Sequence, residues 1–157
     1  MMKEHSFQYT MLNSYTELGA EDLQLVERAF NACSKAYAPY SKFHVGASVL
    51  LENGEIAEGN NQENIAYPSG LCAERVALFW VGANFPDTKV LTLAIVAKGD
   101  LLPVDQILSP CGGCRQVMLE TELRQNFAYR VIIVSQNNRT MIFNSAKDLL
   151  PFSFGSM

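Results

Sequence analysis

The sequence has few basic residues and no long apolar run. Its 157 residues include 12 Lys and Arg against 16 Asp and Glu, which gives a formal net charge of −4. Proteins that bind the phosphate backbone of nucleic acids need clustered Lys and Arg, and the sequence has no such cluster. The apolar runs are too short to cross a bilayer, while a hydrophobic share of 48% excludes a wholly disordered chain. We therefore expect a globular protein that acts on a small molecule and contacts neither nucleic acid nor a membrane.

A secretory signal is also missing. The opening stretch, MMKEHSFQYTMLNSY, has no continuous apolar core and no small-residue cleavage site. We therefore expect a cytoplasmic protein whose thiols stay reduced. The chain has no repeat, low-complexity tract or linker, so we expect one domain over residues 19–157. Residues 1–18 form an N-terminal extension. The alternation of Phe7, Tyr9 and Met11 is consistent with an extra edge strand, and a frayed tail is the alternative.

Helices and strands alternate along the rest of the chain. Apolar residues at three- and four-residue steps predict a helix over 21–37, before Pro39. The pair Asn53-Gly54 suits the tight turn of a β-hairpin between two strands. The elements expected after the first helix are strands over 45–51 and 56–60, a helix over 72–82, a strand over 90–97, a helix over 111–124, strands over 129–135 and 141–143, and a helical turn over 146–150. This order predicts an α/β fold with a central, partly parallel sheet.

Three of the four cysteines lie at predicted helix starts. Cys111 and Cys114 are three residues apart, so their sulfurs share one face of a first helical turn. Amides and the dipole at a helix N-terminus favour thiolates, the form that binds zinc. With Cys72 as a third ligand, a tetrahedral Zn²⁺ keeps one position open, as catalytic zinc sites do. The pattern therefore predicts a catalytic zinc site.

Glu74 stands two residues after Cys72. There its carboxylate can take a proton from zinc-activated water and return it to the substrate. Three thiolates leave the zinc site with one net negative charge, and Arg75 and Arg115, each beside a ligand, are candidates to offset it. For Arg115, a solvated or carboxylate-paired place on the helix surface is the rival interpretation. A Cys-x-Glu segment followed by Pro-Cys-x-x-Cys is the order typical of zinc-dependent nucleobase deaminases.

Two other uses of the cysteines stay open at this point. Cys33 would close the zinc site as a fourth ligand, but it lies on the apolar stripe of the first helix, where a buried inert thiol is commoner. A closed site would also leave Glu74 without a role. A redox Cys-x-x-Cys is expected after the first strand of a βαβ unit, whereas this pair comes late in the chain.

Several separate blocks of the sequence resemble the small, homotetrameric cytidine deaminases. The resemblance covers residues 21–154 and includes, in order, AYAPYSKFHVGA (36–47), GNNQEN (59–64), YPSGLCAERVALF (67–79), SPCGGCRQ (109–116) and LLPFSF (149–154). It implies a three-layer α/β/α sandwich with a central mixed sheet of about five strands, one Zn²⁺ per chain, and a homotetramer with sites shared between subunits. Two features depart from the family: Asn60 stands where Cys is frequent, and the N-terminal extension is longer than in many relatives. The loop over 98–109, which borders the metal segment, is also individual.

The resemblance also implies roles for single residues. For the metal centre these are the zinc ligands Cys72, Cys111 and Cys114, with Glu74 as the proton shuttle. For the substrate they are Asn61 and Glu63 on the ribose hydroxyls, Phe43 beside the sugar and base, the Ala73 backbone with Glu74 on the pyrimidine edge, and Phe154 reaching into a neighbouring subunit's site.

The sequence thus predicts hydrolytic deamination of free cytidine and 2′-deoxycytidine to uridine and 2′-deoxyuridine with release of ammonia, a reaction of pyrimidine salvage. One alternative is a deaminase of a modified cytosine nucleoside such as blasticidin S, although Asn61 and Glu63 favour an ordinary ribose. Another is a zinc-stabilised interaction module without catalysis. Editing of polynucleotides is disfavoured because it needs a basic channel for the flanking phosphates.

Overall fold

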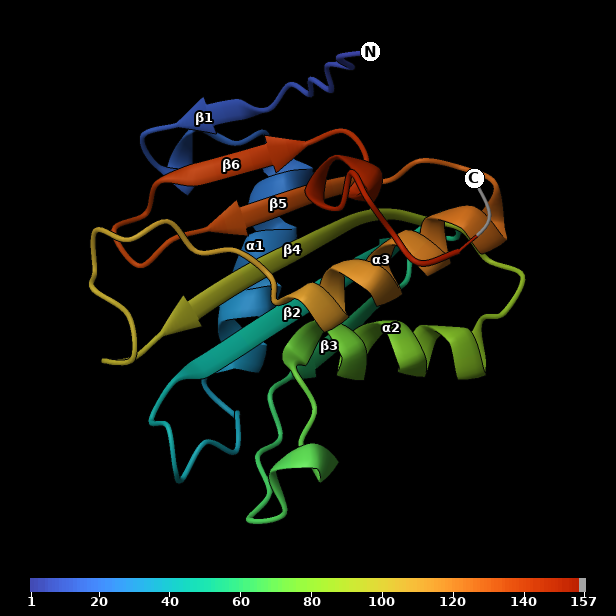
Figure 1. The fold of residues 1–157 in the computed structure, drawn as a ribbon. Coiled ribbons are helices and arrows are strands. Elements are labelled where there is room, and N and C mark those ends of the chain that lie inside the picture. Colours follow the sequence, from blue (N-terminus) through green and yellow to red (C-terminus); the bar gives the residue numbers. More distant parts are fainter. Residues whose placement is uncertain (156–157) are drawn as a thin grey trace.

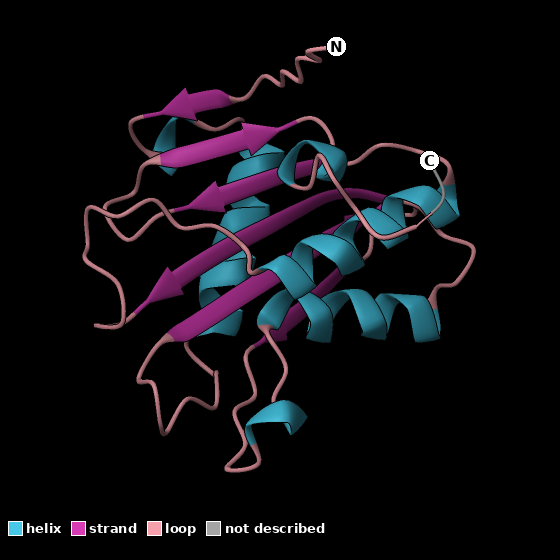
Figure 2. Cartoon of the chain, viewed as in Figure 1, coloured by secondary structure: helices cyan, strands magenta, loops and turns pink. Residues whose placement is uncertain are grey.

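A six-stranded sheet with strand order β1-β6-β5-β4-β2-β3 forms the centre of the structure, a computed structural model that describes residues 1–155. Helix α1 covers one face of the sheet, and α2 and α3 lie side by side on the other (Figures 1 and 2). The strands are β1 (Thr10–Leu12), β2 (His44–Leu51), β3 (Ile56–Asn60), β4 (Val90–Lys98), β5 (Arg130–Val134) and β6 (Thr140–Phe143). The helices are α1 (Ala20–Cys33), α2 (Ala73–Asn84) and α3 (Gly112–Gln125), with 3-10 turns at Tyr15–Glu17, Tyr67–Ser69 and Ala146–Leu149.

The sheet is mixed, as expected. Strands β4 and β5 run parallel, whereas the pairs β1·β6, β2·β3, β2·β4 and β5·β6 are antiparallel. The α/β/α sandwich is therefore confirmed, but the expected count of about five strands is wrong. The sixth strand is β1, which pairs with β6 from Thr10 opposite Ile142 to Leu12 opposite Thr140. Within residues 1–155 no helix is both long and apolar enough to span a bilayer.

Helix α1 ends at Cys33, four residues earlier than its apolar pattern predicted. Tyr37 is withdrawn from the helix because its backbone pairs with the segment after β3. Its N–H donates to Asn61 O at 3.0 Å, and its carbonyl accepts from Glu63 N at 2.9 Å. The Tyr37 side chain is 54% exposed, so it does not continue the buried stripe of α1. Tertiary hydrogen bonds thus override the helical periodicity at this end.

The β2–β3 hairpin is as predicted, with Gly54 taking the positive φ of 85° at the turn. Gly59 in β3 then sets how closely α2 can approach the sheet. A Cβ at this position would lie 2.6 Å from both Ala73 O and Ala77 N. Only glycine allows the first turns of α2 to pack this near, and those turns carry the residues of the predicted site.

Candidate active site

The sulfurs of Cys72, Cys111 and Cys114 meet between the starts of α2 and α3. Cys72 is the N-cap residue of α2, Cys111 is the N-cap residue of α3, and Cys114 lies in the first turn of α3. All three sulfurs lie within 4.8 Å of one another, and the Cys72 and Cys111 sulfurs are 3.9 Å apart. The structure therefore brings together the three cysteines that the sequence singled out.

This cluster fits one Zn²⁺ per chain. Sulfurs bound to a tetrahedral zinc at about 2.3 Å are separated by about 3.8 Å, close to the spacing of Cys72 and Cys111. Neither N-cap cysteine caps its helix through a side-chain hydrogen bond, so each sulfur is available as a ligand. Three thiolate ligands leave a fourth position for water or substrate, as in catalytic zinc sites.

Arg75 is the cation next to this cluster. Its Nη2 lies 3.7 Å from Cys72 Sγ as a hydrogen-bond donor. A hydrogen bond from the Cys114 thiol, together with the Arg75 guanidinium, holds the pKa of Cys72 well below its usual range. The bond to Cys72 and burial raise the pKa of Cys114. Arg115, by contrast, donates to Pro110 O at 2.9 Å and to Leu149 O at 3.0 Å, so it braces the chain before α3.

Glu74 lies in the first turn of α2, and its residue surface is only 4% exposed. Burial raises the pKa of its carboxyl to about 7, and the charge of the Cys72 thiolate adds to the rise. A carboxyl with such a pKa both accepts and releases a proton readily near neutral pH. This property suits a residue that shuttles protons beside a metal centre.

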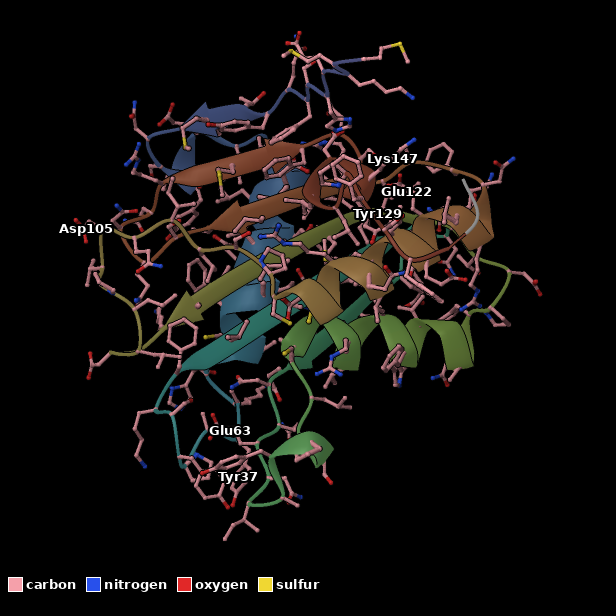
Figure 3. All side chains as sticks on the ribbon, viewed as in Figure 1. Tyr37, Glu63, Asp105, Glu122, Tyr129 and Lys147 are labelled. Atoms are coloured by element: carbon pink, nitrogen blue, oxygen red, sulfur yellow. The ribbon has the colours of Figure 1, made fainter. Side chains whose placement is uncertain are left out.

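A cavity of about 710 Å³ opens over the cysteines and Glu74. Figure 3 shows Glu63, one of its lining residues, on the loops beyond the starts of α2 and β2, with Tyr37 beside it. Phe43, Asn61 and Glu63 line this cavity together with Cys72, Glu74, Arg75 and Cys111. Ala73, which stands between the lining residues Cys72 and Glu74 in the sequence, is fully buried and does not itself line the cavity.

Asn61 and Glu63 are both held by the chain around Phe43. Asn61 Oδ1 accepts from Val45 N and Asn61 Nδ2 donates to Phe43 O, both at 2.8 Å. The Glu63 carboxylate accepts from Tyr40 N at 2.9 Å and from the Ser41 hydroxyl, and this last bond lowers the pKa of Glu63. Each side chain therefore comes to the cavity in a fixed orientation, with hydrogen-bonding capacity left for a ligand.

Phe154 does not line this cavity. Its residue surface is 90% exposed, and its backbone is held by the Gln116 side chain through hydrogen bonds of 2.8 and 3.2 Å. The Phe154 side chain is therefore exposed on the surface of its own chain.

Residues 20–130 match the family model of the cytidine and deoxycytidylate deaminase zinc-binding region. The chain belongs to this family. The matched segment contains the three clustered cysteines together with Asn61, Glu63 and Glu74.

Individual members of the deaminase family agree with this assignment. The cytidine deaminase of Halalkalibacterium halodurans is 41% identical over 96 residues, which are 61% of this chain and 68% of that protein. The probable cytidine deaminase of Dictyostelium discoideum is 32% identical over 87% of this chain and 86% of its own. The crystal structure of cytidine deaminase from Burkholderia pseudomallei matches with a TM-score of 0.69 at 36% identity, covering 87% of this chain and 100% of that one. The predicted resemblance and fold are therefore confirmed.

Several lining residues of this deaminase-family chain were not identified from the sequence. They include Tyr40, Ser41, Tyr67, Leu101, Leu102 and Leu108. Tyr67 is 76% exposed, and its ring meets that of Tyr40 edge-on, with centroids 6.2 Å apart. The leucines belong to the loop over 98–109, which the sequence marked as individual. Its position next to the metal segment could have indicated that these leucines line the site.

Proposed function

We propose that this protein is a zinc-dependent hydrolase that converts free cytidine and 2′-deoxycytidine, with water, into uridine and 2′-deoxyuridine with release of ammonia. The observation that carries the proposal is the buried Glu74 carboxyl beside a three-cysteine cluster at the base of a cavity. When bound, zinc supplies Lewis acidity that makes water a nucleophile near neutral pH. The water oxygen bonds to C4 of the pyrimidine while Glu74 takes one proton from it and delivers that proton to N3. Glu74 then takes the remaining proton from the new C4 hydroxyl and gives it to the amino group, so that the C4–N bond breaks and ammonia leaves.

The substrate's sugar is proposed to lie against Phe43, Asn61 and Glu63. The lowered pKa of Glu63 keeps its carboxylate ionised, and an ionised carboxylate accepts hydrogen bonds only, which suits sugar hydroxyls. Asn61 retains one N–H beyond the one that it gives to Phe43 O. The Ala73 backbone and Glu74 are proposed to recognise the pyrimidine edge, because Glu74 lines the cavity and Ala73 stands between it and Cys72 at the start of α2.

The charges around the cavity favour a free nucleoside over a nucleotide. Among the described lining residues, Arg75 is the one cation, and its guanidinium donates to Cys72. Glu63 and Glu74 are carboxyl groups, so a 5′-phosphate would meet no free positive partner in this set.

We therefore expect cytidine and 2′-deoxycytidine to be deaminated with kcat/KM values about 100-fold above those of CMP and dCMP. An unpaired phosphate loses charge-assisted hydrogen bonds that are worth about 3 kcal/mol, which corresponds to that ratio. The measurement is a substrate panel followed by ultraviolet absorbance, with zinc quantified in the same sample. Equal turnover of dCMP would contradict the proposal, and turnover of blasticidin S alone would favour the modified-nucleoside alternative.

The non-catalytic zinc module is not favoured. Cys33, which it needs as a fourth ligand, packs among Leu25, Val26 and Ala29 on the α1 side of the sheet. Its thiol donates to His44 O at 3.2 Å. A cytoplasmic location and a role in pyrimidine salvage are part of our proposal, since a reducing compartment keeps the thiols free to bind zinc and the proposed substrates are free nucleosides.

A homotetramer in which Phe154 completes a neighbouring subunit's site is also part of the proposal. The support is the outward presentation of Phe154 by Gln116 and the exposed apolar residues Phe79 and Trp80 on α2, which would otherwise face water. Light scattering should then give about four times the chain mass of 17.4 kDa.

Mixing two inactive variants tests the shared site. We expect Glu74→Gln and Phe154→Ala each to lose activity alone, whereas chains refolded together regain a substantial share of it. In mixed assemblies, a site with an intact Glu74 can receive Phe154 from a neighbouring Glu74→Gln chain. Two batches of a single variant refolded together serve as the control. No recovery in mixtures of the same oligomeric mass would contradict a role for Phe154 across subunits.

A further inference from the structure

Loop 99–109, which follows β4 and leads to α3, forms an apolar side of the cavity. Leu101, Leu102 and Leu108 line the cavity, and Leu102 also packs against the core on the face covered by α2 and α3. Asp105 marks the exposed outer bend of the loop (Figure 3). The loop has no helix or strand of its own, so its shape depends on contacts with other parts of the chain.

Two consecutive residues after β5 supply such contacts. Gln136 Oε1 accepts from Gly99 N at 2.9 Å, and Gln136 Nε2 donates to Leu102 O at 3.1 Å. Ser135 Oγ accepts from Leu108 N at 3.0 Å. Gln136 therefore holds the first part of the loop, and Ser135 holds its last part.

Gln136 is itself held in place by a tight turn between β5 and β6. Ser135 N donates to Arg139 O, and Asn138 N donates to Ser135 O, both at 2.9 Å. Asn138 takes the left-handed φ of 69° that closes the turn. The backbone at Gln136 is thus fixed, and its side chain reaches from this fixed point to the loop.

Gly99 brings the loop against the segment that carries Phe43, another lining residue of the cavity. Its φ of 146° is strained for any residue with a side chain, and a Cβ there would lie 2.3 Å from Lys42 O and 2.9 Å from Phe43 Cα. The loop therefore packs closely against the segment that carries Phe43. Gln136 accepts a hydrogen bond from Gly99 N and so holds the loop at the point where it contacts the Phe43 segment.

The end of the loop next to Cys111 is held by other hydrogen bonds. Arg115 donates to Pro110 O at 2.9 Å and to Ser109 Oγ at 2.7 Å, directly before Cys111. Gln136 makes its loop contacts at Gly99 and Leu102, nine residues or more from Cys111 in sequence. A change at Gln136 should therefore disturb the wall of the cavity and leave the cysteine cluster intact.

We propose that Gln136 is a positioning residue for substrate binding: its two hydrogen bonds to loop 99–109 hold Leu102 and the Phe43 segment in place as adjoining parts of the substrate pocket's wall. The inference rests on the proposed function, because it takes the cavity to be the nucleoside site. Gln136 does not line the cavity and acts through the loop.

The test is the steady-state kinetics of Gln136→Ala with cytidine. We expect KM to rise about tenfold, with kcat within about twofold and zinc content unchanged, because two hydrogen bonds that shape ground-state binding are lost. Gln106→Ala is the matched control, since Gln106 is an exposed glutamine on the same loop that does not line the cavity, and we expect it to keep both constants.

Two more variants separate positioning from general stability. Gln136→Met keeps the length of the side chain without its donor and acceptor, and we expect it to reproduce the raised KM while its melting temperature stays near that of the wild type. In the double variant Gln136→Ala/Leu102→Ala, we expect the rise in KM to fall short of the product of the two single effects, because Gln136 acts partly through Leu102.

The outcomes distinguish the inference from the function on which it rests. A wild-type protein that deaminates no cytosine nucleoside overturns both. Wild-type turnover of cytidine together with an unchanged KM in Gln136→Ala and Gln136→Met overturns only the role of Gln136. A fall in kcat and zinc content with no change in KM also overturns it, because such a result places the effect at the metal centre.

Discussion

Glu74→Gln is expected to reduce kcat for cytidine by a factor of about 10² to 10⁴, the usual contribution of a general acid–base group. Glutamine has nearly the same shape but neither accepts a proton from water nor delivers one to the pyrimidine. No other group can replace Glu74 as the proton shuttle, since among the described lining residues it is the one carboxyl next to the cysteine cluster. The measurement is the fall in cytidine absorbance at saturating substrate.

The controls for this experiment separate chemistry from folding. Glu120→Gln makes the same change at an exposed position of α3 and should keep full activity. Zinc content and melting temperature of Glu74→Gln should match the wild type, because the carboxyl is not a ligand of the cluster. Wild-type kcat in Glu74→Gln would rule out the proposed proton shuttle, whatever the substrate.

The second large effect is expected from loss of a zinc ligand. Cys114 is fully buried and points into the cluster, so Cys114→Ala should lower zinc from about one per chain to near zero and abolish turnover. Treating the wild type with a chelator should lower its melting temperature by roughly 5–15 °C, because a ligand that binds only the folded state stabilises it by several kcal/mol. Metal analysis and thermal melting measure the two effects.

Cys33→Ala is the matched control for Cys114→Ala. Both thiols are buried, but Cys33 packs against the sheet on the α1 side and donates to His44 O. The variant should keep its zinc and its kcat, with a small loss of stability from the missing sulfur. If Cys33→Ala loses zinc as Cys114→Ala does, the cluster is a closed four-cysteine site and the hydrolase proposal is wrong.

Local chemistry made much of this structure predictable. Gly54 marks the hairpin turn, and Pro, Gly and Cys residues mark the starts of α2 and α3. The cysteine cluster was accessible because helical spacing places Cys111 and Cys114 on one turn, and only the position of Cys72 depended on the fold.

The parts that the sequence did not predict depend on contacts between distant residues. The end of α1 was misplaced because Tyr37 pairs with residues beyond β3, which no periodicity reveals. The sequence allowed an extra strand in residues 1–18 but did not reveal its partner, because β1 has three residues and is stable only beside the distant β6. Gln136 lies 37 residues from Gly99, and no spacing rule connects a turn glutamine to a pocket loop.

The parallel pairing of β4 and β5 has a consequence for how such an enzyme can diversify. Parallel neighbours require the chain to cross over the sheet, and here that single crossing carries loop 99–109, Cys111, Cys114 and all of α3. Ser135 and Arg115 anchor the crossing just before the cysteines, so insertions or deletions nearer Asp105 are absorbed at the exposed bend. Changes at this bend can therefore alter the leucine lining of the cavity without displacing Cys111 and Cys114, although the three leucines and these two cysteines are encoded in one continuous stretch of the gene.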